Sequence, residues 1–551
     1  MKKLILVLVV ALICLGVNAQ KFSYTFKVKG LAANQDVYLA NYFGDQLYYY
    51  DTVKSSDGVV KFERDVVKGG VYAVVLPGPK TFEVILNGIE TKVELETDTV
   101  DFVRSMKVTK SDENKAFYSY FKFLNSMTDK AGPLRGKKDQ ESKDKLANID
   151  KEVKAHQQEL SANHKDQLFG AIIDMSIEVV VPKELQGDTS KQLERYHYYK
   201  NNFFSNYHLK DERIVRTPIF AKKMKYFFEK VVVQHPDSIL VQAYKMIDQL
   251  PENTDLFKYV VHTLTYKYET SKIMGMDAVF VGIALKYYCR NDKGMTRAFW
   301  LEDQKVEAIL KAEKALAKAK KSLAMAKSKG DTAAISVANA SIKKKEKSVK
   351  SANKNDKIKE ICDRATTLNR LTLFKKGGAP DLILQDSTEK TWVNIRDIKT
   401  DYKVLVFWDP GCGHCKKEIP KLQKLYKELK TKKISLEIIG INTELENKDW
   451  RKYIRENDLD WINISDNPEI NSNARKYIVE QKTTTLQSLN FRDIYDIFST
   501  PQIFLLNKDN EIIAKKIGVF NLVEILERNL KIEIDYVPTL PDPEDGDDHS
   551  H

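Results

Sequence analysis

The sequence predicts a multidomain protein with three parts: an N-terminal antiparallel β-sandwich, an α-helical middle domain with a helical-hairpin insert, and a C-terminal α/β domain. Three observations support this division. Short apolar runs separated by turn residues fill the first hundred positions, helical periodicity dominates residues 111–372, and strand and helix patterns alternate beyond them. A chain of 551 residues is also too long for a single hydrophobic core.

The first nineteen residues have the pattern of an export signal. Lys2 and Lys3 precede the apolar run 4–15, and small residues end the segment at Ala19. The run is too short to span a bilayer, so we expect cleavage near Ala19 and export to the periplasm or cell envelope. Cys14 lies inside the apolar run and belongs to the removed segment.

Residues 20–110 are predicted to form the β-sandwich domain. Turn residues such as Asp57-Gly58 and Asn87-Gly88 separate its short apolar runs. The run Tyr48-Tyr49-Tyr50 is either an exposed binding patch or part of a strand, and strand propensity favours the second interpretation. The expected strands are 22–28, 37–42, 59–62, 71–76, 81–86 and 92–95.

Residues 111–372 are predicted to form the helical domain. An aromatic cluster at 196–207 suggests a peptide or sugar site, but core packing explains it more simply. Cys289 and Cys362 lie in this domain and are either bridged or two buried thiols. The expected helical segments are 117–124, 168–179, 226–233, 239–250 and 257–268.

A Lys-rich insert at 305–357 interrupts the helical domain. Apolar residues repeat every seven positions on both sides of residue 329, which predicts an antiparallel helical hairpin with its bend at Gly330 and an N-cap at Asp331 or Thr332. The insert has 15 Lys and 5 acidic residues, a balance of +10 within a total of +12. This concentration argues against a nucleic-acid partner. A solvated helix face is the favoured interpretation, and weak contact with an anionic membrane surface is the alternative.

The C-terminal part contains a Cys-x-x-Cys motif. Cys412 and Cys415 follow the apolar run 404–408 and precede a helical pattern, so a strand brings two thiols to the first turn of a helix. The unpaired N–H groups and the dipole of that helix favour a thiolate. We therefore predict a redox-active pair. A zinc half-site lacks two further ligands at a compatible spacing, and a structural disulfide would close too small a ring to constrain the unfolded chain.

Three short sequences give residues 373–535 a resemblance to the thioredoxin superfamily, and especially to the exported TlpA/ResA-like thiol–disulfide oxidoreductases. They are Ala-Pro-Asp at 379–381, Cys-Lys-Lys-Glu-Ile-Pro at 415–420 and Thr-Pro-Gln-Ile-Phe-Leu-Leu-Asn at 500–507. The preceding regions resemble the poorly characterised domains that often precede such thioredoxins, a likeness that assigns them no activity.

The resemblance implies a thioredoxin fold for 373–535 and roles for several residues. Cys412 is the attacking thiol, Cys415 the resolving thiol, and Pro501 a cis-proline beside them. Glu418 is implied to shuttle protons to the thiols, although a first-turn glutamate also simply suits the helix dipole. Pro420 corresponds to the proline that kinks this helix in thioredoxins.

The sequence departs from the family pattern at two positions. Val406 stands where thioredoxins place a buried acid, and Gly411 stands where most of them have a tryptophan. His414, between the cysteines, is expected to stabilise the Cys412 thiolate and so make the disulfide more oxidising. The additional stretch 480–496 is expected to form a lid or a docking element.

The sequence thus predicts an exported thiol–disulfide oxidoreductase that needs no cofactor and no metal. We expect protein or small-molecule disulfides as substrates and a membrane-associated thiol as the upstream electron donor. A binding scaffold on a thioredoxin fold and a thiol peroxidase are the alternatives. The acidic residues 536–551 are expected to form a disordered tail.

Overall fold

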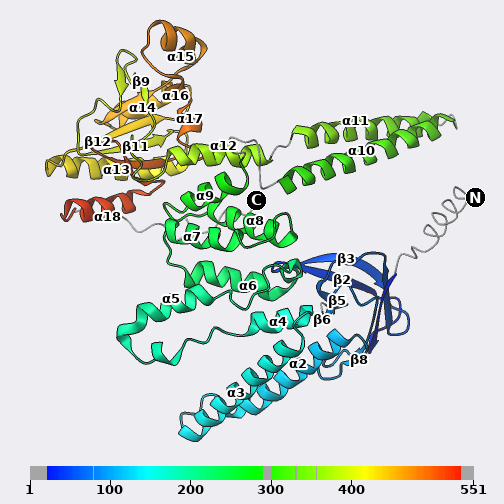
Figure 1. Ribbon diagram of the computed structural model, residues 1–551. Helices are drawn as coiled ribbons and strands as arrows, with labels where there is room; N and C mark the ends of the chain where they lie inside the picture. The colour runs from blue at the N-terminus through cyan, green and yellow to red at the C-terminus, as the bar shows by residue number, and fades with distance from the viewer. Residues whose placement is uncertain (1–20, 79, 290–298, 329–331, 355–356, 535–551) are drawn as a thin grey trace, which may run out of the picture. The chain divides into compact units, whose positions relative to one another are not determined.

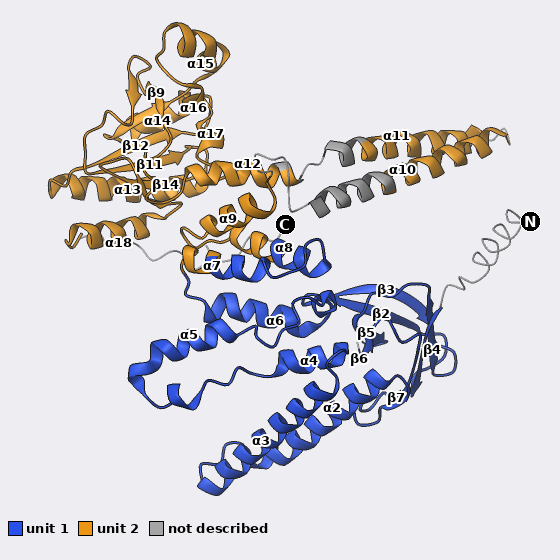
Figure 2. Ribbon diagram, in the orientation of Figure 1, with its two compact units in different colours: residues 1–234, 241–262 blue, residues 235–240, 263–551 orange. Residues whose placement is uncertain are grey.

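The computed structural model describes residues 21–78, 80–289, 299–328, 332–354 and 357–534 (Figure 1). The chain divides into two compact units, residues 1–234 with 241–262 and residues 235–240 with 263–551 (Figure 2). The expected export signal, the hairpin bend at 330–331 and the acidic tail lie outside the described residues. No helix in the described ranges is both long and apolar enough to cross a membrane.

The first unit begins with two four-stranded sheets around one core, as predicted for the β-sandwich. Alternate residues of β1 point inward, so Tyr24 and Phe26 are buried while Lys27 is exposed. The pairings are antiparallel except for that of β1 with β7, which is parallel. The sheet orders are β4-β1-β7-β8 and β3-β2-β5-β6. The strands are β1 (Phe22–Lys29), β2 (Asp36–Phe43), β3 (Gln46–Lys54), β4 (Val59–Arg64), β5 (Gly70–Leu76), β6 (Lys80–Leu86), β7 (Lys92–Asp98) and β8 (Lys107–Lys110).

The tyrosine run 48–50 lies in β3, at the edge of its sheet. Its rings are exposed, and two of them contact tyrosines of β2 and β5. Tyr49 packs on Tyr38 with 5.0 Å between ring centroids, and Tyr50 on Tyr72 with 5.6 Å. The run therefore forms a strand, as its propensity predicts, but packs on the sheet surface rather than in the core.

The helices of the first unit follow the sandwich. Glu113 of α2 is buried, and its carboxylate accepts hydrogen bonds from the side chain of Asn87 and, at 2.7 Å, from the backbone N–H of Phe169 at the start of α4. These bonds tie two helices to the sandwich. The helices are α2 (Asp112–Ala131), α3 (Gln140–Asn163), α4 (Leu168–Ser176), α5 (Gln192–Asn202) and α6 (Pro218–Tyr226), and both units share α7 (Pro236–Ile247) and α8 (Asp255–Glu269).

The second unit contains α9 (Asp277–Tyr287), α10 (Phe299–Ser328), α11 (Thr332–Lys354) and α12 (Lys357–Arg370). Helices α10 and α11 lie side by side as the predicted hairpin (Figure 1). Small residues occupy the centre of their interface, because Ala319, Ala326 and Ala338 are buried there. Cys289 and Cys362 form a disulfide with 5.5 Å between their Cα atoms, so the two are bridged rather than free.

The C-terminal α/β domain has one seven-stranded sheet in the order β10-β9-β13-β12-β11-β14-β15. Strands β11, β12 and β13 are parallel, and β14 and β15 are antiparallel to their neighbours. Apolar residues of α13, α14 and α18 share one core with the sheet. The strands are β9 (Ile383–Asp386), β10 (Trp392–Asn394), β11 (Tyr402–Trp408), β12 (Leu436–Asn442), β13 (Ile462–Ser465), β14 (Gln502–Asn507) and β15 (Ile512–Lys515). The helices are α13 (Gly413–Thr431), α14 (Lys448–Glu456), α15 (Pro468–Ser472), α16 (Leu486–Leu489), α17 (Phe491–Ile494) and α18 (Val519–Leu530).

A buried lysine joins this domain to the preceding helices of the same unit. Lys515, at the end of β15, has a side chain that is 4% exposed. Its ammonium group lies 2.5 Å from a carboxylate oxygen of Asp277 in α9 and donates to the carbonyl oxygen of Leu371, just after α12, at 2.7 Å. The α/β domain is therefore held to α9 and α12 by a buried ionic contact.

Candidate active site

Strand β11 brings the two cysteines to the carboxyl end of the sheet. After Trp408, the side chain of Asp409 accepts a hydrogen bond from the N–H of Gly411 at 2.6 Å, and its carbonyl oxygen accepts one from the N–H of Cys412 at 3.3 Å. These two bonds form a tight turn that ends at the N-cap position of α13, which Cys412 occupies. Cys412 is half-buried, whereas Cys415, one turn into the helix, is only 1% exposed.

The start of β14 completes the site. Strand β14 pairs with β11 so that Gln502 lies opposite Phe407, which places Thr500 and Pro501 beside the cysteine turn. The Thr500–Pro501 peptide bond is cis, as the resemblance implied. The Sγ atom of Cys412 donates a hydrogen bond to the carbonyl oxygen of Thr500 at 3.3 Å. The structure therefore brings together Cys412, Cys415 and Pro501.

The two thiols have very different acidities. Desolvation by burial raises the pKa of Cys412, but hydrogen bonds from the side chain of Thr500 and from the Cys415 and His414 amides outweigh it, so its pKa lies below the ordinary value. The contact with the Thr500 carbonyl serves the thiol form, because an S–H donates it, and is given up when the proton leaves. Burial raises the pKa of Cys415 to about 12. The lowered pKa of Cys412 thus favours its thiolate, whereas Cys415, with a pKa of about 12, is a protonated thiol at neutral pH.

His414 and Glu418 stand apart from the thiol atoms. The imidazole of His414 is exposed, and it is the backbone amide of this residue that favours the Cys412 thiolate. The carboxylate of Glu418 pairs with the ammonium of Lys421 at 2.7 Å. Within the described residues, no hydrogen bond joins either side chain to a thiol. Pro420 lies inside α13, as the resemblance implied.

The structure explains the two departures from the family pattern. Val406 is fully buried in the apolar core, so no carboxylate lies beneath the thiols at this position. A Cβ atom on Gly411 would lie 2.9 Å from the carboxylate oxygen of Asp409 that bonds to its amide, so the Asp409 turn favours glycine. Sequence reasoning missed the roles of Asp409 and Thr500, although the Asp-Pro-Gly sequence is a turn signal.

The stretch 480–496, expected to form a lid or docking element, contains the short helices α16 and α17. Phe491 and Tyr495 of this stretch are fully buried, and their ring centroids lie 5.9 and 5.0 Å from that of Phe407 in β11. Arg492 binds the buried carboxylate of Asp466 through two 2.9 Å contacts. The part that includes α17 is therefore packed firmly against the sheet.

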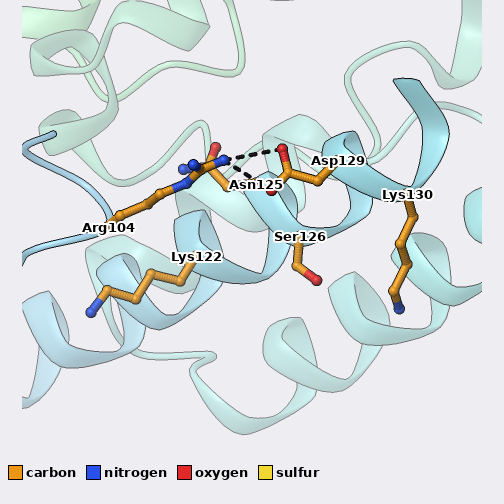
Figure 3. Close-up of a pocket in the computed structure, with 6 residues that line it drawn as sticks. All are labelled: Arg104, Lys122, Asn125, Ser126, Asp129 and Lys130. Carbon is orange, nitrogen blue, oxygen red and sulfur yellow. Dashed lines mark hydrogen bonds and ion pairs between the residues drawn. The ribbon is translucent and has the colours of Figure 1, made fainter. Parts of the chain in front are cut away.

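A second hollow, in the first unit, lies beside α2 (Figure 3). Its charged groups are already paired. Arg104 donates to both carboxylate oxygens of Asp129, at 3.0 and 2.9 Å, and Lys122 donates to the carbonyl oxygen of Met106 at 2.7 Å. In the part of the chain that the structure describes, no cluster of three or more His, Cys, Asp or Glu side chains is placed to share a metal ion.

Comparison with known proteins identifies relatives of the α/β domain. Residues 377–515 match the model of the AhpC/TSA family. Over 140 residues the chain is 25% identical to the thiol-disulfide oxidoreductase ResA of Bacillus cereus and 24% identical to that of Bacillus subtilis. These matches cover 25% of this chain, and 68% and 65% of the two relatives respectively.

Some of the matching solved structures cover about a third of this chain, and another covers almost two thirds of it. A domain of a possible thiol-disulfide isomerase from Cytophaga hutchinsonii is 33% identical, with a TM-score of 0.23, and the match covers 29% of this chain and 95% of that chain. A thioredoxin-like protein from Bacteroides caccae is 14% identical, with a TM-score of 0.30, and that match covers 64% of this chain and 98% of the other.

Proposed function

We propose that the α/β domain of this chain is a thioredoxin-like thiol–disulfide oxidoreductase, and that the protein is an exported enzyme that exchanges electrons with protein disulfides through Cys412 and Cys415. The observation that carries the proposal is the asymmetry of the two thiols. A half-buried thiol with a lowered pKa at a helix N-terminus attacks readily, and a buried thiol one turn away stays protonated until it is needed.

In the reducing direction, the Cys412 thiolate attacks one sulfur of a substrate disulfide. A Cys412–substrate S–S bond forms, the substrate S–S bond breaks, and the leaving thiolate takes up a proton. Cys415 then loses its proton and attacks Cys412, which forms the 412–415 disulfide and releases the second substrate thiol. The substrate gains two electrons and two protons, and the reverse sequence donates a disulfide.

Three nearby residues have proposed supporting roles. Glu418 accepts the Cys415 proton through water during the second step, and its ion pair with Lys421 holds the carboxylate on the first turns of α13. His414 adds to the stabilisation of the thiolate through its imidazole, which is exposed. Pro501 presents the backbone beside Cys412 to an extended substrate.

A redox titration of the purified protein tests the proposal. We expect a reversible two-electron midpoint for the 412–415 pair, and turnover of a disulfide substrate that Cys412→Ser abolishes. Cys415→Ser should trap the mixed disulfide with substrate. Disulfide turnover that persists in Cys412→Ser would refute the proposal. Consumption of hydrogen peroxide that needs Cys412 but not Cys415 would instead identify a thiol peroxidase.

The electron donor and the location are also proposed. Since an exported reductase must be re-reduced outside the cytoplasm, we propose a membrane-associated thiol donor. The Lys-rich hairpin suits a weak contact with an anionic membrane. Among the described side chains of 311–349 there are ten lysines, nine of them exposed, and one acidic residue, Glu346.

Vesicle co-sedimentation tests this contact. Binding to vesicles that contain anionic lipid should weaken with added salt and with the charge reversals Lys343→Glu and Lys344→Glu in α11. The same reversals at the exposed residues Lys151 and Lys154 of α3 are the matched control and should leave binding unchanged. Equal loss in both variants would show a general charge effect and contradict a specific role for the hairpin.

A further inference from the structure

An exposed aromatic ring lies on the segment that reaches Cys412. Phe498 is 78% exposed and precedes by two residues Thr500, whose carbonyl oxygen bonds to the Cys412 thiol. The cysteine turn itself offers little apolar surface, because Gly411 and Gly413 flank Cys412. Gly411 stands where most thioredoxins have a tryptophan, so the aromatic surface before the first cysteine is absent.

Contacts of the residues on both sides of Phe498 fix the backbone of this segment and keep the ring exposed. Asp496, just before it, is buried and pairs with Lys516 at 2.5 Å. The N–H of Ile497 bonds to the carbonyl oxygen of Arg492 at 2.8 Å, and Gln502 enters β14 on the other side. Other aromatic residues of this part of the chain, such as Phe491, are packed in the core. Phe498 therefore points outward from a fixed backbone.

A neighbouring helix orients the ring without covering it. The guanidinium carbon of Arg364, in α12, lies 5.7 Å from the centroid of the Phe498 ring. Arg364 is itself fixed by an ion pair with Glu269 at 2.9 Å. A guanidinium group at this distance attracts an aromatic face and restrains the ring. The ring is pre-organised, and most of its surface remains available to a second molecule.

We propose that Phe498 is a specificity residue that binds a large apolar side chain close to the disulfide-bonded cysteine of an extended polypeptide substrate. This inference rests on the proposed function. Only Ser499 stands between Phe498 and Thr500 in this bend, so their Cα atoms lie within about 7 Å of each other, and side chains on one face of a bound strand are also about 7 Å apart. A substrate whose cysteine sulfur reaches Cys412 would thus bring a residue one or two positions away over the ring.

Peptide disulfides that differ at one position test the proposal. The purified, reduced protein would act on two otherwise identical peptides, with Phe or Ser two residues from the cysteine, and on hydroxyethyl disulfide as a small substrate. We expect Phe498→Ala to lower the second-order rate constant for oxidation of the reduced protein about ten-fold for the Phe peptide. For the Ser peptide and for hydroxyethyl disulfide, this rate constant should change less than two-fold. Phe498→Leu should keep most of the preference, because it keeps the apolar contact.

The control is Phe520→Ala, which removes another exposed phenylalanine, in α18 of the same domain, and should leave all three rates unchanged. An equal loss on both peptides, or no loss, in Phe498→Ala would overturn the inference while leaving the proposed function standing. Failure of the unmodified protein to reduce any of the three disulfides would overturn the proposed function, and the inference with it.

Discussion

Alkylation of the reduced protein should modify Cys412 far faster than Cys415. At pH 7.5 a thiol whose pKa is about 12 is ionised to roughly 3 parts in 100,000, whereas a thiol whose pKa lies below 9.0 is ionised to at least about 3%. The thiolate populations therefore differ by about a thousand-fold or more. A thiolate of higher pKa is intrinsically more nucleophilic by about 0.4–0.5 log units for each pKa unit. After this compensation, the alkylation rate of Cys412 should exceed that of Cys415 about fifty-fold, and the burial of Cys415 increases this ratio further.

The assay is a time course with iodoacetamide, followed by mass mapping of the two cysteines. The rate at Cys412 should rise with pH and reach half of its plateau value below pH 9, because the pKa of this thiol is lowered and the thiolate is the reacting form. Cys412→Ser is the control, and its remaining thiol should react slowly. Labelling of Cys415 within five-fold of the Cys412 rate would refute the assignment of nucleophile and resolving thiol.

Three further predictions follow from the same unit. Replacing Cys289 and Cys362 with serine should lower the free energy of unfolding by about 4 kcal/mol, because the bond closes a loop with a sequence separation of 73, and urea unfolding measures this. Asp277→Ala should lower the free energy of unfolding by about 3 kcal/mol, since this substitution leaves the buried Lys515 ammonium unpaired. Lys515→Met should lower the free energy of unfolding clearly less, and equal losses in the two variants would contradict this reasoning. In the protein with both cysteines, Glu418→Gln should slow the resolution of the mixed disulfide between Cys412 and substrate about a hundred-fold, measured by stopped-flow mixing, and an unchanged rate would exclude the proton relay.

Local patterns predicted the elements that carry the site. Apolar runs identified β11 and β14, and three- and four-residue periodicity identified α13, so the positions of Cys412 and Cys415 at the helix start followed directly. The hairpin could be predicted because its seven-residue apolar repeats are symmetric about residue 329. Its interface nevertheless centres on Ala319, Ala326 and Ala338, since helices that approach closely bury small residues and leave longer ones at the margin.

Contacts between residues that lie far apart in the sequence could not be predicted from local patterns. The parallel pairing of β1 with β7 joins residues about 70 positions apart, and no local pattern encodes such a register. Likewise, Lys515 looks like a surface lysine until Asp277, 238 positions earlier, is placed against it. The carbonyl of Thr500 beside Cys412 is a third case, because a backbone atom has no sequence signature.

The disulfide between Cys289 and Cys362 gives the Lys-rich hairpin the topology of a closed lasso. A protease cut at any peptide bond between the two cysteines leaves the fragments covalently joined, so the nicked chain should migrate as one species until a reductant is added. Because the disulfide holds Cys289 next to Cys362, we expect that the hairpin between them can be shortened or replaced by mutagenesis without altering the path of the chain from α9 to α12.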